Sequence, residues 1–272
     1  MNVLIIGAGL VGSTLARQLR ADGHHVTTTT TTPAKVETLL EFSDNAVVLR
    51  GTDAEAVATA VKAADAVVVT AGPSAERSMT PEDRAAHYKE ILVDTAANVM
   101  AAVEDQHVIG FSSNVVYGND ADVDGTVTEE SPLTSWADPS PQNFQAAERV
   151  YTASGNACVF RCPEMHGDDE MELEDKVKMA HSLLKGSVPF RAEALFYQLH
   201  ASRAAAAAKH AIEQRLTGIY NLVPTEVPPS NAEVFDGISV ELGLPPLEYR
   251  GELPGPAVPI SGAKLAATGF TI

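Results

Sequence analysis

The sequence has few basic residues and no long apolar run, and each absence excludes a class of function. Its 272 residues include 19 Lys plus Arg against 36 Asp plus Glu, a formal net charge of −17. Nucleic-acid binding needs a basic surface to meet the phosphates, so we expect no nucleic-acid partner. No run of about 18 apolar residues occurs, so we expect no membrane span. The chain begins with a short apolar stretch without a basic leader, which indicates a strand rather than a signal peptide. We therefore expect a cytoplasmic protein, or one in an organelle stroma.

Cysteine is also scarce. Cys158 and Cys162 are the only two, four residues apart in ACVFRC. In a strand both side chains would point to one face, too far apart along it for an easy disulfide. A metal site would need more ligands. We expect two buried thiols in a reducing compartment and no metal.

Short apolar runs alternate with helical stretches over the first 160 residues. The pattern predicts strands at 3–7, 25–32, 45–51, 65–72, 107–113 and 156–162, with helices at 15–23, 33–42, 53–64, 81–104 and 141–153. Such alternation requires parallel pairing. We predict an α/β fold, a Rossmann-type doubly wound parallel sheet with helices on both faces. Residues 1–162 would form the dinucleotide-binding domain.

The pattern loosens from residue 163 onward. Helices are expected at 176–186, 201–216 and 231–243, and a short strand at 218–223. We predict that residues 163–272 form a smaller C-terminal substrate lobe, interwoven with the sheet into one unit.

The segment GAGLVG matches G-x-G-x-x-G between the first strand and its helix. The first glycine allows the tight turn, the second lets the backbone approach a pyrophosphate, and the third lets helix and strand pack closely. The start of the helix then offers free N–H groups to the phosphates. The predicted dinucleotide contacts here are Gly7, Ala8, Gly9, Leu10, Val11 and Gly12.

The second strand lacks the acidic residue that binds a ribose with two free hydroxyls. That position falls at Thr30, and no Asp or Glu occurs between Gly23 and Glu37. Thr30, Thr31 and Thr32 offer hydroxyls, and Lys35 offers charge. NADP(H) is therefore favoured as the cofactor, with NAD(H) as the alternative.

Two further turns are expected to contact the cofactor. Thr52 and Asp53 follow the third strand, where the carboxylate can accept from the adenine amino group or cap the next helix. Ala71, Gly72 and Pro73 end the fourth strand, where small residues permit close backbone approach.

The motifs GAGLVG, GTD, VVVTAGP, FSSNVVYG, AAE at 146–148 and FRCPEMHG resemble the extended short-chain dehydrogenases/reductases. The similarity is greatest to their atypical, NAD-dependent epimerase/dehydratase-like branch. It implies that Ser113 bonds a substrate oxygen and that Ser112 lies beside the cofactor. It also implies a small-molecule substrate, and a homodimer through helices 81–104 and 141–153 is one expectation.

The sequence departs from this family at its catalytic Tyr-x-x-x-Lys. Alignment on AAE puts Ser140 and Phe144 at those positions, and neither can supply a lysine-assisted phenol. His166 is one candidate to replace it as the acid–base group, since histidine titrates in the useful range. Tyr117 is another, although the resemblance implies a mainly structural role for it.

Three functions stay open at this point. The first is an NADP(H)-dependent oxidoreductase or epimerase/dehydratase-like enzyme that acts on a small carbonyl or hydroxyl metabolite with displaced acid–base residues. The second is a non-catalytic dinucleotide-binding sensor or scaffold. The third is a non-redox isomerase or lyase that uses the same pocket.

Overall fold

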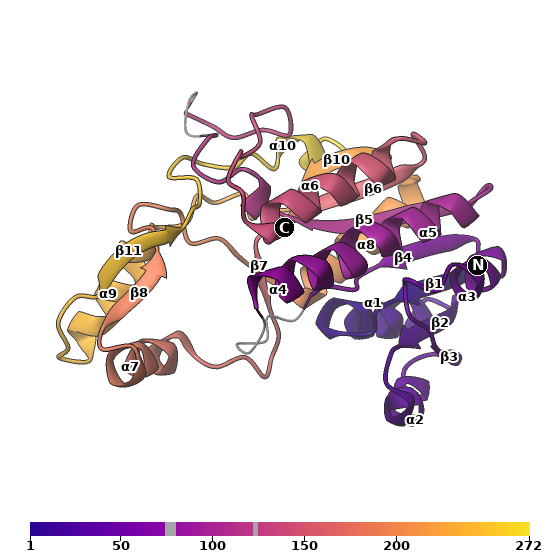
Figure 1. Ribbon diagram of the computed structural model, residues 1–272, viewed down its shortest axis with the longest axis horizontal. Coiled ribbons are helices and arrows are strands. Elements are labelled where there is room, and N and C mark those ends of the chain that lie inside the picture. Colours follow the sequence, from indigo (N-terminus) through magenta and orange to yellow (C-terminus); the bar gives the residue numbers. More distant parts are fainter. Residues whose placement is uncertain (74–79, 122–124) are drawn as a thin grey trace.

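A seven-stranded parallel sheet forms the centre of the structure, a computed structural model that describes residues 1–73, 80–121 and 125–272. Its strands lie in the order β10-β6-β5-β4-β1-β2-β3 (Figure 1). Every neighbouring pair is parallel. The strands are β1 (Asn2–Ile6), β2 (His25–Thr30), β3 (Asn45–Val48), β4 (Ala66–Val69), β5 (His107–Ser113), β6 (Ala157–Cys162) and β10 (Gly218–Asn221). The predicted Rossmann-type sheet is confirmed.

Helices cover both faces of this sheet, which explains the nearly continuous apolar strands. Alternate side chains of β1 enter different cores: Ile5 packs on one face and Leu4 on the other. Residues of α1 (Leu10–Ala21), α2 (Val36–Leu40) and α8 (Ala201–Gln214) line the first core, and residues of α3 (Ala54–Lys62), α5 (Thr95–Ala102) and α6 (Pro139–Thr152) line the second. A 3₁₀ turn, η1 (Pro33–Lys35), precedes α2.

The expected helix 81–104 has three parts. α4 (Pro81–Tyr88) and α5 are joined by a π-helical stretch, η2 (Lys89–Asp94). Thr80 caps the start of α4 by accepting from the Asp83 N–H, and Pro81 occupies the first turn of α4, where its missing N–H leaves no hydrogen bond unmade. A short 3₁₀ turn, η3 (Asn114–Val116), follows β5.

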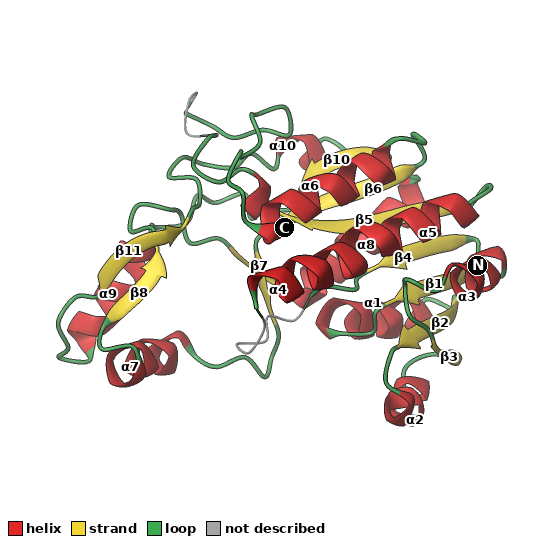
Figure 2. Cartoon of the chain, viewed as in Figure 1, coloured by secondary structure: helices red, strands yellow, loops and turns green. Residues whose placement is uncertain are grey.

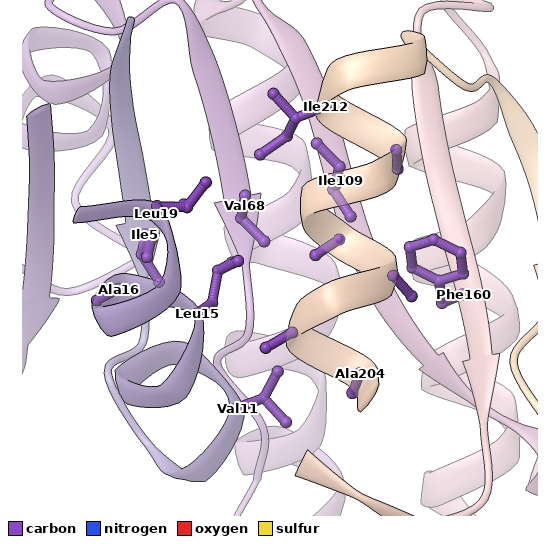
Figure 3. Packing of buried hydrophobic residues seen from close by; sticks show 14 of the residues in the cluster. Ile5, Val11, Leu15, Ala16, Leu19, Val68, Ile109, Phe160, Ala204 and Ile212 are labelled. Carbon is purple, nitrogen blue, oxygen red and sulfur yellow. The ribbon is translucent and has the colours of Figure 1, made fainter. Parts of the chain in front are cut away.

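The alanine-rich helix α8 returns the chain to the main sheet after the small lobe has begun. Its buried face is mostly alanine, and these small side chains let the helix lie close to α1 and the strands (Figure 3). Ala204 and Ile212 of α8 are drawn there beside Leu15 of α1. β10 then adds to the sheet next to β6. The residues after 162 therefore contribute to both parts of the molecule.

The small lobe consists of α7 (Leu173–Leu183), β8 (Ser187–Phe190), α9 (Asn231–Glu241) and β11 (Glu248–Leu253), apart from the main sheet in Figure 2. It has its own apolar core, in which Phe235 contacts Phe190 and Phe196 at ring-centroid distances of 5.9 and 5.0 Å. β8 and β11 pair in parallel.

Four strands were missed by the sequence analysis: β7 (Glu164–His166), β8, β9 (Gln198–His200) and β11. They have only three to six residues, and three of them contain proline, glycine or charged side chains, so no period of two emerges. β7 and β9 pair in parallel where the chain leaves and re-enters the main domain. A last helix, α10 (Ala263–Ala266), has four residues. No described helix is long and apolar enough to cross a membrane.

Candidate functional site

The candidate site lies at the carboxyl edge of the main sheet. In a parallel sheet all strands end at the same edge, so the turns after β1, β2, β3, β4 and β5 are neighbours. The predicted cofactor contacts fall on these turns. The turns after β1 and β4 are in direct contact, because the N–H groups of Thr70 and Ala71 both donate to the Ile6 carbonyl, at 2.9 and 3.0 Å.

The glycine-rich turn is held tightly against the end of β4. Gly7 has φ +99°, and a Cβ there would lie 2.6 Å from Ala71 Cα. A Cβ at Gly12 would collide with the Gly7 carbonyl and the Thr70 hydroxyl, which bond to each other. Gly7 and Gly12 are therefore required by packing, as the fingerprint predicts.

Gly9 differs, because a Cβ there would meet no described heavy atom within 4 Å. Gly9 is the N-cap of α1, and the first turn, Leu10 to Gly12, contains no acidic side chain. The N–H groups at the start of this 12-residue helix therefore face open space at the positive end of the helix dipole. This geometry fits the diphosphate of a dinucleotide.

Thr29 supports this turn and was not singled out from the sequence. Its hydroxyl accepts from the Gly7 N–H at 3.1 Å, and its carbonyl accepts from the Ala8 N–H at 3.2 Å. Thr29 is 2% exposed. The threonine-rich strand explains why the contact was missed, since six successive threonines give no signal for the one whose hydroxyl faces β1.

The end of β2 is polar and carries no carboxylate, as expected. The Thr30 hydroxyl accepts from the Thr32 N–H at 3.1 Å, while Thr31, Thr32 and Lys35 are exposed. The structure adds Arg50, an exposed residue after β3. The preceding residue, Leu49, donates to the Thr30 carbonyl at 2.9 Å, which brings this cation to the end of β2.

Asp53 caps α3 by accepting from the Ala56 N–H at 3.1 Å. The carboxylate has a second oxygen, so capping leaves the adenine role of Asp53 and its neighbour Thr52 as a prediction. Ala71, Gly72 and Pro73 lie partly or fully exposed beyond β4, with Gly72 in open space among the described atoms.

A buried polar network lies under the end of β5. Arg161 of β6 forms a two-pronged ion pair with Glu148 of α6, with Nε–Oε1 at 2.9 Å and Nη2–Oε2 at 2.7 Å. Ser112 donates to the same carboxylate at 2.6 Å. Burial opposes the charge of Arg161, but its bonds to Glu148 prevail and raise the pKa of Arg161. The Ser112 hydroxyl is thus engaged in the core rather than directed to a cofactor.

Tyr117 belongs to this network too. Its hydroxyl donates to Asn221 Oδ1 at 2.6 Å and accepts from Arg161 Nη1 at 2.9 Å, and the residue is 0% exposed. Burial raises the pKa of Tyr117, although the charge of Arg161 opposes the rise. An acid–base phenol needs contact with substrate and a lowered pKa. Tyr117 therefore has a structural role, which corrects its inclusion among the catalytic candidates.

Ser113 ends β5 and is only partly buried. Its hydroxyl accepts from the Val115 N–H at 3.3 Å, and it can still donate to another group. The aligned positions on α6 give no acid–base pair. Ser140 lies in the first turn, and Phe144 packs against two apolar clusters.

His166 lies at the end of β7, partly exposed, with its ring 5.2 Å from that of His200 in an edge-to-face contact. His200 Nε2 lies 3.1 Å from Asp168 Oδ1, and its Nδ1 lies 2.7 Å from the Ser202 hydroxyl. The next residue, Gly167, lies against Leu10 at the start of α1: a Cβ at Gly167 would lie 2.6 Å from Leu10 Cδ1. His166 therefore directly precedes a residue that lies against the start of α1.

A cleft of about 750 Å³ separates the carboxyl edge from the small lobe. On the sheet side it is lined by Asn114 and Val115, which directly follow Ser113, and by Glu164, two residues before His166. The small lobe contributes mainly apolar side chains from α7, β8, α9 and β11. This size suits a small organic ligand.

Comparison with known proteins agrees with this geometry. The sequence model of a family described as NAD(P)H-binding matches residues 7–192. That stretch runs from the first glycine of the fingerprint to the end of β8 and beyond. No curated protein matches the chain in sequence.

Solved structures share the fold over almost the whole chain. WbmG of Bordetella bronchiseptica, in complex with NAD, has a TM-score of 0.76 and 22% identity, covering 100% of this chain and 88% of its own. UDP-glucose 4-epimerase of Thermus thermophilus, in complex with NAD, has 0.74 and 21%, covering 99% and 93%. A dTDP-4-dehydrorhamnose reductase of Clostridium acetobutylicum has 0.74 and 16%, covering 100% and 94%. The family match confirms the expected NAD(P)H binding, and the solved structures confirm the expected fold.

Proposed function

The chain belongs to the NAD(P)H-binding family, and from this premise we propose that it is an oxidoreductase or epimerase-type enzyme that acts on a small carbonyl or hydroxyl metabolite. The observation that supports this most directly is the contact between Gly167 and Leu10. Glu164 lines the cleft, and Gly167, three residues later, lies against the turn that would bind the phosphates. The cleft and this turn are therefore close together. A substrate in the cleft and a dinucleotide on α1 would then meet beside His166.

When bound, the nicotinamide exchanges a hydride with the substrate carbon while the oxygen gains or loses a proton, so that a ketone, NAD(P)H and H⁺ become an alcohol and NAD(P)⁺. The chain's own residues bind the cofactor through the α1 N–H groups and the turn at Gly9. Thr29 and Thr70 hold that turn in place through its backbone.

We assign the proton transfer to His166, with Ser113 as a hydrogen-bond donor to the substrate oxygen. His166 is partly exposed and lies two residues after Glu164, which lines the cleft, whereas Tyr117 is buried. His200 fixes its ring from the edge, and His200 is itself held by Asp168 and Ser202. A histidine whose ring is oriented through such contacts can donate or accept a proton at a substrate oxygen.

The first test is calorimetric titration of cofactor-free protein with NADP⁺, NADPH, NAD⁺ and NADH. We expect saturable binding of at least one pair. Gly9→Ala places a methyl group where the diphosphate would lie, so it should weaken binding at least about tenfold, or 1.4 kcal/mol, without lowering the melting temperature. Gly237→Ala, which adds the same methyl group in open space on α9, is the matched control.

Failure of all four nucleotides to bind would refute the proposal. Binding without turnover of any carbonyl or alcohol, and with His166→Ala indistinguishable from the parent protein, would favour the non-catalytic sensor instead.

We further propose a preference for NADP(H). The threonine at position 30 leaves no carboxylate to repel a 2′-phosphate, and Lys35 and Arg50 supply positive charge near the end of β2. Thr30→Asp should weaken NADP⁺ binding by roughly tenfold and leave NAD⁺ binding equal or stronger. Thr217→Asp introduces the same charge at an exposed residue before β10, at the opposite end of the sheet from β2, and serves as the control.

A further inference from the structure

The small-lobe side of the cleft is apolar. Its lining includes the side chains Phe190, Phe196 and Phe235 and the proline pair Pro254 and Pro256. Phe235 is mostly buried and packs against the other two phenylalanines. The wall is therefore a preformed apolar surface supported by the lobe's own core.

Several apolar side chains in this cleft are also exposed to solvent. Met171, Met179, Leu184 and Leu253 line it and are 48%, 37%, 47% and 44% exposed. Met179 belongs to α7, Met171 and Leu184 flank it, and Leu253 ends β11. Although α7 and β11 are far apart in the sequence, all four side chains line the same cleft. Exposed apolar surface concentrated in a cleft indicates a ligand that covers it.

The charges of the cleft disfavour an anion. Lys176 is the one basic residue among the described residues that line it, and its Nζ lies 2.7 Å from Glu170 Oε1. Glu164 and Glu170 both line the cleft as well, so its formal charge is −1. A sugar nucleotide carries a diphosphate, which proteins usually bind with Arg or Lys side chains or with free N–H groups.

The two helices that begin at the cleft do not offer such N–H groups. The first turn of α7 contains Glu174 and Asp175, whose charges already compensate the helix dipole. At the start of α9, Ser230 and Glu233 form a capping box that uses the N–H groups of both residues.

Resting on the proposed function, we infer that the substrate of this site is an uncharged, largely apolar carbonyl compound or alcohol rather than a nucleotide sugar. Its hydrocarbon part would lie against α7, β8 and β11, and its oxygen would lie toward Ser113 and His166. The fold neighbours named above include enzymes of nucleotide sugars, but at 16–22% identity they share the fold alone.

Trp136 makes the inference directly testable, because it is the only tryptophan of the chain and lines the cleft. Emission excited at 295 nm would be followed while the protein is titrated with 4-phenyl-2-butanone or with UDP-glucose, each with and without saturating NADP⁺. We expect a saturable change with the ketone and at least tenfold weaker binding, or none, with UDP-glucose.

Two variants separate cleft binding from a general surface effect. Met179→Lys puts a charge on the apolar wall and should weaken ketone binding at least fivefold. Leu183→Lys makes a comparable change one turn along the same helix, at a residue that is 70% exposed and is not among those lining the cleft, so ketone binding should not change. Leu253→Lys, from β11, should repeat the effect of Met179→Lys.

Tighter binding of UDP-glucose than of the ketone would overturn the inference. So would no saturable ketone signal, or equal ketone affinity in the Met179→Lys and Leu183→Lys proteins. These outcomes are read from the titrations without NADP⁺, so they are distinct from failure of the nucleotide titrations, which would overturn the proposed function instead.

Discussion

The buried ion pair between Arg161 and Glu148 gives the sharpest prediction about stability. Both side chains are almost fully buried, at 3% and 4% exposure. Arg161→Met keeps the volume and the apolar stem but removes two bonds to Glu148, one to the Tyr117 hydroxyl at 2.9 Å and one to the Glu129 carbonyl at 3.2 Å. The Glu148 carboxylate would remain buried with Ser112 as its described side-chain partner.

Breaking one half of a buried pair costs about 3–5 kcal/mol, since an uncompensated charge stays in the core. For a chain of this length the entropy of unfolding implies a fall in melting temperature of roughly 5 to 9 °C. Urea unfolding followed by circular dichroism would measure the free-energy change. The double variant Glu148→Leu/Arg161→Met removes both charges and should recover at least half of the loss. A single variant that costs less than about 1 kcal/mol, or a double variant that costs the sum of the two single ones, would refute this reasoning.

Three further predictions concern separate parts of the chain. Gly12→Ala forces a methyl group into the Gly7 carbonyl and the Thr70 hydroxyl, so, unlike Gly9→Ala, it should lower both stability, by about 1–3 kcal/mol, and nucleotide affinity in the same calorimetric titrations. Burial, with a smaller effect from the charge of Arg215, lowers the pKa of His107 in the folded protein. As the pH falls, His107 is therefore protonated in the unfolded chain before it is protonated in the folded one. Stability should therefore be lost as the pH falls below about 6.5, at up to about 1.4 kcal/mol per pH unit, and His107→Gln should flatten that slope in urea titrations between pH 5 and 7; an unchanged slope would contradict the assignment. Burial raises the pKa of Cys158 to about 12 and also raises that of Cys162, so a thiol reagent at pH 8 should label neither in the native protein and both in urea; rapid native labelling would show that β6 is accessible.

The main sheet was predictable because its central strands β1, β4, β5 and β6 are buried on both faces. All seven segments predicted as strands became its strands, and the alternation with helices correctly predicted their parallel pairing. The small lobe was less predictable. Its strands β8 and β11 are short, contain Pro189 and Gly251, and obtain their structure from packing against Phe235 rather than from their own pattern.

The cofactor turn was also predictable, because its glycines are required by backbone contacts within one βαβ unit. Arg50 was not, since its proximity to Thr30 depends on the pairing of β2 with β3. The same limit applies to the cleft. Met179 of α7 and Leu253 of β11 are 74 residues apart in sequence, and both line the cleft because α7 packs on β8, which pairs with β11.

Residues from three of the motifs that carried the family resemblance form one buried network, and this network has a structural role. Ser112 and Tyr117 belong to FSSNVVYG, Glu148 to AAE, and Arg161 to FRCPEMHG, and these four side chains bond to one another in a buried network. The network fixes the end of β5 to α6 and β6. It can do this whether or not α6 carries a tyrosine and a lysine, because Ser140 and Phe144 lie outside these bonds. The motifs could therefore predict the fold without predicting the acid–base chemistry. For that reason we propose a proton-transfer residue that the fold leaves partly exposed, His166, whose sequence neighbour Gly167 lies against Leu10.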